Sequence, residues 1–189
     1  MLYFVRHGQT NHNLNKLLAG HCDIELNENG LKQAGEAAEN SKNLKLDLIY
    51  CSPLIRAKQT CNKINEFHNC EVIVRDELIE RSFGKYESCE YGCIDGIKAW
   101  NYYDNAYDND IEPLRDVFKR VFIFLEEIKE EYKSKNILIV AHNDIGRAIY
   151  CYFNGIPKDG NVRDINMSNA TIVGYDWRNV NDKKSVGKV

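Results

Sequence analysis

Apolar positions in this chain follow two patterns that alternate along it. Short, mostly apolar runs, rich in β-branched and aromatic residues, lie at 2–5, 46–51 and 137–141, and they predict buried strands. Stretches with apolar residues three and four positions apart follow these runs and predict helices that bury one face. Strands that alternate with helices predict an α/β fold. We expect a three-layer α/β/α sandwich with a mostly parallel sheet and right-handed crossovers.

The starts of the predicted helices carry recognisable residues. Asn27 can cap the first long helix, and Ser52 followed by Pro53 can cap the second. The longest helical stripe runs over 114–132, and another helix is expected over about 143–153. Each helix therefore begins close to the end of a strand or a loop, as a compact α/β domain requires.

The remaining segments complete one predicted domain over residues 1–177. Further strands are expected at 71–74 and 171–177, and a helical and loop excursion, rich in aromatic and acidic residues, at about 86–112. The aromatic residues of this excursion either form a lid over a ligand or pack into a small satellite core. Residues 178–189 are polar and predict a frayed C-terminal tail.

Composition narrows the class of protein. Of the 189 residues, 43% are hydrophobic and 28% charged, which is typical of a globular protein. A net charge of −3 argues against sequence-independent binding of nucleic acid, and the sequence has no apolar run long enough for a membrane helix. Met1 leads directly into the first strand, so we expect no signal peptide and a cytoplasmic protein. The seven cysteines lie mostly within apolar patterns and lack a C-x-x-C pair, so we expect reduced thiols and no metal site.

Functional side chains follow three of the predicted strands. Arg6 and His7 come directly after the first strand. Ser52 and Arg56 follow the second, and His142 follows the strand at 137–141. Because ligands of open α/β sheets bind beyond the carboxyl ends of the strands, we expect these groups to meet in one crevice. Guanidinium groups, imidazoles and helix N-termini together predict an anion site, and phosphate suits it best.

Four segments resemble, in order, the motifs of the histidine phosphatase superfamily, in its phosphoglycerate mutase-like branch. They are Val-Arg-His-Gly-Gln-Thr at 5–10 with Asn13 beyond it, and the segments 51–60, 78–84 and 140–142. The order and spacing agree over residues 1–177. The resemblance implies the phosphoglycerate mutase-like fold.

The resemblance also implies a role for each matched residue. His7 would be the nucleophile that takes up the phosphoryl group. Glu80 would protonate the leaving oxygen and then activate the water that hydrolyses the intermediate. The residues that bind the phosphate would be Arg6, Asn13, Gly20, Arg56 and His142. The two arginines and His142 would also act in catalysis, and neither a metal nor another cofactor is implied.

Three positions depart from the family pattern near the expected site. Asn143 and Asp144 stand where the family usually has two glycines, and Asp144 adds a negative charge near an anion. We expect both side chains to turn away from the phosphate and to cap the helix that follows. Ser88 follows Glu87 where the family often has glycine.

The predicted function is metal-independent hydrolysis of a small phosphorylated metabolite through a phosphohistidine. A phosphoglycerate mutase needs extra cations over the site, but the excursion offers only Lys98 among many acids. The alternatives are a phosphoglycerate mutase or sugar bisphosphatase, and a non-catalytic member that binds a phosphorylated ligand. The expected partner is a small phosphorylated molecule rather than nucleic acid or membrane, and a homodimer stays open.

Overall fold

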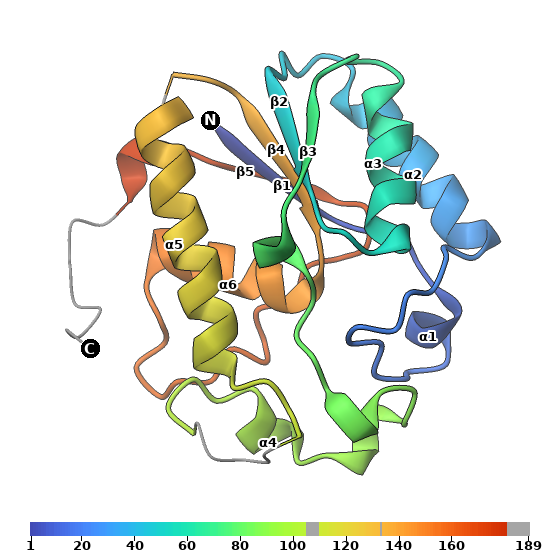
Figure 1. The fold of residues 1–189 in the computed structure, drawn as a ribbon, viewed down its shortest axis with the longest axis vertical. Helices are drawn as coiled ribbons and strands as arrows, with labels where there is room; N and C mark the ends of the chain where they lie inside the picture. Colours follow the sequence, from blue (N-terminus) through green and yellow to red (C-terminus); the bar gives the residue numbers. More distant parts are fainter. Residues whose placement is uncertain (105–109, 133, 181–189) are drawn as a thin grey trace.

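The computed structural model describes residues 1–104, 110–132 and 134–180 (Figure 1). Its centre is a five-stranded sheet in the order β3-β2-β4-β1-β5. The strands are β1 (Leu2–Arg6), β2 (Leu48–Cys51), β3 (Val72–Val74), β4 (Ile137–Ala141) and β5 (Ile172–Tyr175). The first four run parallel, and β5 pairs antiparallel with β1. The predicted α/β fold with a mostly parallel sheet is confirmed.

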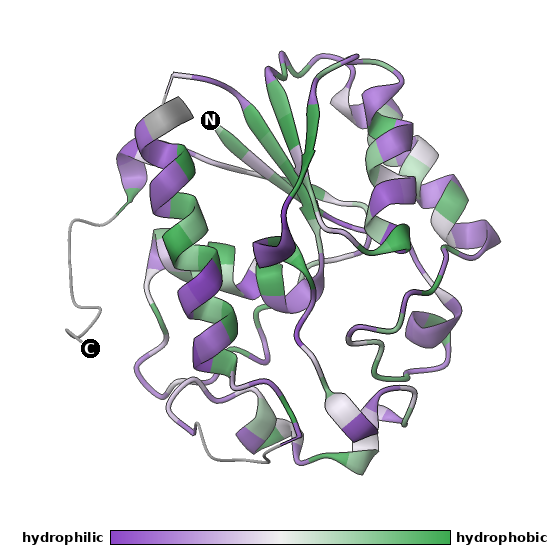
Figure 2. Ribbon diagram, viewed as in Figure 1, coloured by the Kyte–Doolittle hydropathy of each residue, from purple (hydrophilic) through white to green (hydrophobic). Residues whose placement is uncertain are grey.

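Helices cover both faces of the sheet (Figure 1). They are α2 (Glu28–Ser41) and α3 (Ile55–Asn65) on one face, and α5 (Leu114–Tyr132) and α6 (Asn143–Asn154) on the other. Side chains along β4 alternate between the two layers. Leu138 and Val140 pack with α2 and α3, whereas Ile137 and Ile139 pack with α5 and α6. Figure 2 shows the resulting hydrophobic sheet between helices that are hydrophobic on one side only.

The excursion beyond β3 is built from short elements. These are η1 (Asp76–Leu78), η2 (Gly84–Tyr86), η3 (Tyr91–Cys93) and α4 (Gly96–Ala99). Phe83, Ile94 and Ala99 are buried in a separate small core, and Trp100 packs against it. The described aromatic residues Tyr86 and Trp100 therefore belong to a satellite core, one of the two expected arrangements. Positions 105–109 lie outside the described residues.

Two helix starts differ in how they are capped. Asn27 caps α2, because its side chain accepts a hydrogen bond of 2.8 Å from the Gly30 N–H. The predicted Ser52 cap is wrong. α3 begins later, after Leu54, whose side chain makes no capping bond. The Ser52 hydroxyl instead accepts from the Leu54 N–H at 3.3 Å and turns toward the functional site.

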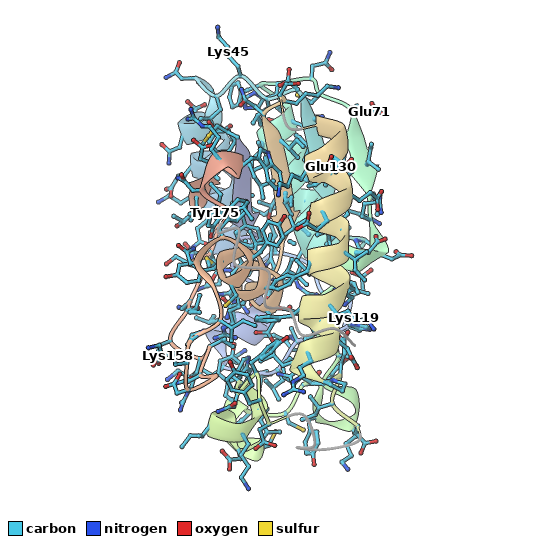
Figure 3. The ribbon with its side chains drawn as sticks, turned by 90° about the vertical axis from the view of Figure 1, so that its left-hand side faces the viewer. Lys45, Glu71, Lys119, Glu130, Lys158 and Tyr175 are labelled. Atoms are coloured by element: carbon cyan, nitrogen blue, oxygen red, sulfur yellow. The ribbon has the colours of Figure 1, made fainter. Side chains whose placement is uncertain are left out.

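The outer side of α5 is exposed, and a short segment follows β5. Lys119 and Glu130 are exposed and project from the outer side of α5 (Figure 3). A short turn, η4 (Trp177–Asn179), follows β5, and residues 181–189 of the predicted tail lie outside the described part. The division into a domain over 1–177 and a tail stays a prediction. No helix within the described residues is long and apolar enough to cross a membrane.

Candidate active site

The carboxyl ends of β1, β2 and β4 are neighbours, because β4 lies between the other two strands. Arg6 pairs with Ala141 in the β1–β4 ladder, so the residues that follow the two strands are also close. The rings of His7 and His142 meet edge to face, with centroids 5.1 Å apart. The structure thus brings together two histidines that are far apart in the sequence.

His7 is held as a neutral imidazole. Its Nδ1 lies 2.7 Å from the Gly8 carbonyl, which can only accept, so Nδ1 carries the proton. The lone pair of Nε2 then accepts from the Nε–H of Arg56 at 3.2 Å. Burial, together with the charges of Arg56 and Arg6, lowers the pKa of His7 well below its ordinary value of 6.5. Nε2 is therefore available as a nucleophile at neutral pH.

The backbone after β1 is fixed by close packing. Thr10 caps the short helix α1 (Asn11–Leu14). The Gly8 N–H donates to the Thr60 hydroxyl at 3.0 Å. A Cβ atom at Gly8 would overlap the carbonyl of Gly30, so only glycine allows α2 to approach the loop this closely.

Arg56 is fully buried in the first turn of α3. Besides His7, its guanidinium donates to the Cys22 carbonyl at 2.7 Å and to the Gly20 carbonyl at 2.8 Å. Gly20 adopts a left-handed conformation, with φ +47°, that presents this carbonyl. The contact seen for Gly20, expected to bind phosphate, is thus with Arg56. The planar fork of the arginine is held in one orientation beside the candidate nucleophile.

Arg6 is anchored by a segment far along the chain. One guanidinium nitrogen donates to the Met167 carbonyl at 2.9 Å. Asn169 donates from its amide to the His7 carbonyl at 2.7 Å. Burial lowers the pKa of Arg6, with Glu80 acting in the opposite direction. Sequence analysis did not find Met167 or Asn169, because a backbone carbonyl and a lone asparagine give no motif.

His142 is fully buried, and its Nε2 lies 2.7 Å from the Ser52 hydroxyl. That hydroxyl accepts from Leu54, so we assign its proton to the bond with Nε2 and the ring proton to Nδ1. Burial lowers the pKa of His142 well below 6.5, with Arg56 contributing. Ser52 therefore orients His142, a role that sequence analysis did not give it.

Two donors in the candidate active site have no partner within the part of the chain that the structure describes. Among the described residues, Nδ1 of His142 and Nε of Arg6 are buried and have no hydrogen-bond partner. Buried donors in proteins are nearly always paired. Because both belong to residues that surround His7, an anion that accepts from them is the natural ligand of the site.

Asn13 is oriented by the cap of α1. Its side-chain oxygen accepts from the Thr10 N–H at 3.1 Å, while the Thr10 hydroxyl accepts from the Asn13 N–H. The amide nitrogen of Asn13, and not its oxygen, is thus the atom that can bind an anion.

Glu80 lies two residues after η1 and is buried against the start of α6. Its carboxylate accepts backbone N–H bonds from Arg81 at 3.1 Å, Asn143 at 3.1 Å and Asp144 at 3.3 Å. Burial raises the pKa of Glu80 to about 7, and the charge of Asp144 adds to this. Arg56 acts against that shift. A carboxyl group with a pKa near neutrality can both give and take a proton, which suits general acid–base catalysis.

The expectation for Asn143 and Asp144 is partly wrong. They occupy the first turn of α6 and do not cap it, because His142 already holds the N-cap position directly after β4. Asn143 accepts from the Met167 N–H at 3.0 Å. The Asp144 carboxylate pairs with Arg147 and accepts from the Trp100 indole at 2.9 Å.

Ser88, which stands where the family often has glycine, adopts a strained backbone conformation. Ser88 has a φ of +69°, a conformation that glycine adopts without strain. The neighbouring Glu87 ties the surrounding loops together, because its carboxylate accepts from the backbone of His21 at 2.9 Å and of Phe83 at 3.2 Å.

Within the described residues no group of three or more histidine, cysteine or acidic side chains could hold a metal ion.

Comparison with known proteins places the chain in a family. The model of the histidine phosphatase superfamily (branch 1) matches residues 2–184. The uncharacterized phosphatase PhoE of Bacillus subtilis is 35% identical over 180 residues, covering 92% of this chain and 89% of PhoE. A putative phosphoserine phosphatase 2 of Hydrogenobacter thermophilus is 34% identical over 177 residues, covering 90% and 86%. The chain therefore belongs to the histidine phosphatase superfamily, branch 1.

A solved structure shows the same architecture. A mycobacterial glucosyl-3-phosphoglycerate phosphatase, in complex with VO3, matches with a TM-score of 0.80 and 26% identity, covering 90% of this chain and 88% of that one. The resemblance drawn from the four motifs and the phosphoglycerate mutase-like fold are confirmed. The protein is a phosphatase of this family.

Proposed function

We propose that the protein hydrolyses phosphomonoesters through a phosphohistidine formed on Nε2 of His7. The observation that carries this proposal is the pair of buried, unpartnered donors, Nε of Arg6 and Nδ1 of His142, beside a neutral nucleophile. Three phosphoryl oxygens provide the acceptors that these donors require. Arg56 is placed to complete the set, since it already contacts His7.

The reaction takes two steps. In the first, Nε2 of His7 forms a bond to phosphorus, the ester P–O bond breaks, and Glu80 gives its proton to the leaving oxygen. In the second, water attacks phosphorus, the N–P bond breaks and Glu80 takes the proton from the water. The bond from Nδ1–H to the Gly8 carbonyl stabilises the positive charge that the imidazole gains on phosphorylation.

No metal is needed in this scheme. Charge on the transferring phosphoryl group must be neutralised from the side, a task that Mg²⁺ performs in many phosphotransferases. Here the guanidinium groups of Arg6 and Arg56 perform it from fixed positions. The amide nitrogen of Asn13 adds a neutral donor.

The substrate is a small phosphorylated metabolite. Two relatives are named for phosphoserine and for glucosyl-3-phosphoglycerate, both monoesters of small alcohols. We extend that class, and no individual substrate, to this chain. The cytoplasmic location and the homodimer stay predictions.

The covalent intermediate is the direct test. The protein is mixed with p-nitrophenyl phosphate, quenched in alkali, where phosphohistidine survives, and digested for mass spectrometry. We expect a phosphoryl group on the peptide that contains His7, and none in His7→Ala, which should retain its fold. His12→Ala is the matched control, because His12 lies only five positions away and bonds to Ser88 rather than to the site. Full turnover by His7→Ala would exclude the proposal.

The alternative activities are tested in parallel. Formation of 2-phosphoglycerate from 3-phosphoglycerate, in the presence of the bisphosphate primer, would indicate a mutase. Binding of phosphate without turnover of any monoester in a metabolite panel would indicate a non-catalytic member. Hydrolysis of the panel without isomerisation supports the phosphatase.

A further inference from the structure

Asp144 is a buried charge that the proposed reaction does not use directly. Only 2% of its side chain is exposed. It pairs with Arg147 on the same helix, and both carboxylate oxygens accept from the Trp100 indole, at 2.9 and 3.2 Å. Trp100 belongs to the satellite core of the excursion. A buried ion pair is costly to form, so its position calls for an explanation.

Arg147 extends the same contact to a third segment. It donates to the Ile165 carbonyl at 2.8 Å and to the Arg163 carbonyl at 3.0 Å. Its guanidinium also lies 5.5 Å from the centre of the Trp100 ring. The pair of Asp144 and Arg147 therefore joins the excursion, the start of α6 and the segment that leads to Met167.

The backbone of the same residue holds the candidate acid. The N–H groups of Asn143 and Asp144 donate to the two oxygens of Glu80. The side chain of Asp144 thus anchors the helical turn whose backbone binds Glu80. A change at that side chain is therefore expected to alter the turn that binds the carboxyl group of Glu80.

We propose that Asp144 is a positioning residue for Glu80. Held by Trp100 and Arg147, it fixes the turn that binds the acid, and its negative charge keeps Glu80 protonated for the leaving group. This inference rests on the proposed function, because it assigns a purpose to the acid in that reaction.

The charges around Glu80 show why the negative charge of Asp144 matters for the protonation of Glu80. The cations Arg56 and Arg6 favour the ionised carboxylate of Glu80. Asp144 is the nearby anion that opposes them. Its negative charge raises the pKa of Glu80. Glu112 is engaged by Arg120 at 3.1 Å. The other charged or titratable groups that interact with Glu80 or with its electrostatic partners are Arg6, His7, His21, Arg56, Arg81, Arg120, His142 and Arg147.

The first test is Asp144→Asn, which keeps the size and an acceptor for Trp100 but removes the charge. The pH profile of kcat/KM is measured with an alkyl phosphate, which needs an acid, and with p-nitrophenyl phosphate, which hardly does. For the alkyl phosphate, we expect the alkaline limb to move to lower pH by about one unit. The rate with p-nitrophenyl phosphate should change less than twofold. An unmoved limb, or equal losses on both substrates, would overturn the inference.

The second test is Arg147→Gln, which leaves the charge of Asp144 unopposed. The alkaline limb of the kcat/KM profile for the alkyl phosphate should then move to higher pH, opposite to its shift in Asp144→Asn. A merely structural role would move both variants the same way, so matching shifts overturn the inference even if either protein is less stable. If the wild-type protein turns over neither substrate, the proposed function fails instead, so the two failures are distinguishable.

Discussion

The Nε–H group of Arg56 donates a hydrogen bond to Nε2 of His7 over 3.2 Å. The cation thereby contacts the atom that would attack phosphorus, and its charge helps to keep the imidazole unprotonated. When a phosphoryl group binds between them, the same N–H can pass to a phosphoryl oxygen. In the proposed reaction, Arg56 would thus serve the free enzyme as well as the transition state.

The substitution Arg56→Lys tests this arrangement. Lysine keeps a charge but cannot donate at once to His7, Cys22 and Gly20 as the guanidinium does. We expect kcat/KM for p-nitrophenyl phosphate to fall by roughly 10²–10³. Arg178→Lys is the matched control, because Arg178 is exposed and pairs only with Asp176 among its described partners. Equal activity of both variants would contradict the role.

Glu80→Gln separates substrates by their leaving groups. The amide keeps an acceptor oxygen for backbone N–H groups but cannot supply the proton. We expect alkyl phosphates to slow by about 10²–10⁴, whereas p-nitrophenyl phosphate slows much less, since its leaving group is a weak base. Values of kcat/KM on the two substrates check this, because kcat/KM does not include the later hydrolysis step, in which Glu80 serves both substrates alike. A common loss on both would show that Glu80 is not the acid.

Chelation should not change the rate. The positive charge in the site comes from Arg6 and Arg56, and the described residues contain no cluster suited to a metal. We expect an unchanged kcat after dialysis against EDTA, and no gain on adding Mg²⁺ or Zn²⁺. A loss that is restored by one of these ions would refute the scheme.

Stability should fall as the pH drops below 6.5. His7 and His142 have lowered pKa values, so below 6.5 the unfolded chain binds protons that the folded protein excludes. Glu80 acts oppositely, because its pKa of about 7 lets the folded state hold a proton that the unfolded chain has released above 4.5. Glu80→Gln removes this opposing contribution. The free energy of unfolding should then fall more steeply with decreasing pH, by about 1.4 kcal/mol per pH unit.

Urea unfolding between pH 5 and pH 7 measures this dependence. His142→Asn should show a shallower loss than the wild type, because one excluded proton is gone. Parallel curves for the wild type and both variants would show that these groups titrate alike in the folded and unfolded states.

Gly8→Ala tests the packing beneath His7. The added methyl group meets the Gly30 carbonyl in a rigid backbone, so we expect a loss of about 1–3 kcal/mol in the free energy of unfolding, with reduced activity. Gly35→Ala is the control, because a Cβ there meets nothing within 4 Å, and its helical position in α2 favours alanine. If both variants unfold at the same urea concentration, the close approach is not rigid.

The sequence predicted those parts of the site that follow strand ends. Arg6, His7 and His142 directly follow buried apolar runs, and a parallel sheet brings such positions together without further information. Glu80 lies in an irregular segment and was found by its motif alone. Its contact with the start of α6 depends on tertiary packing.

The parts that could not be predicted are mostly backbone contacts. The carbonyls of Gly20, Cys22 and Met167 orient the arginines, and any residue type can supply a carbonyl. The Ser52 cap was wrong because a serine before proline can either cap a helix or bond elsewhere. Here its bond with the buried His142 prevailed.

The anchoring of Arg6 and His7 by Met167 and Asn169 has a consequence for biosynthesis. These contacts join positions 161 and 162 residues apart, so the proposed nucleophile leaves the ribosome long before the segment that secures it. A nascent chain has β1 but not the partners that fix Arg6. In the proposed reaction, catalytic competence would therefore be acquired only after residues 167–169 have left the ribosome, and a shorter nascent chain would not attack the phosphorylated metabolites around it.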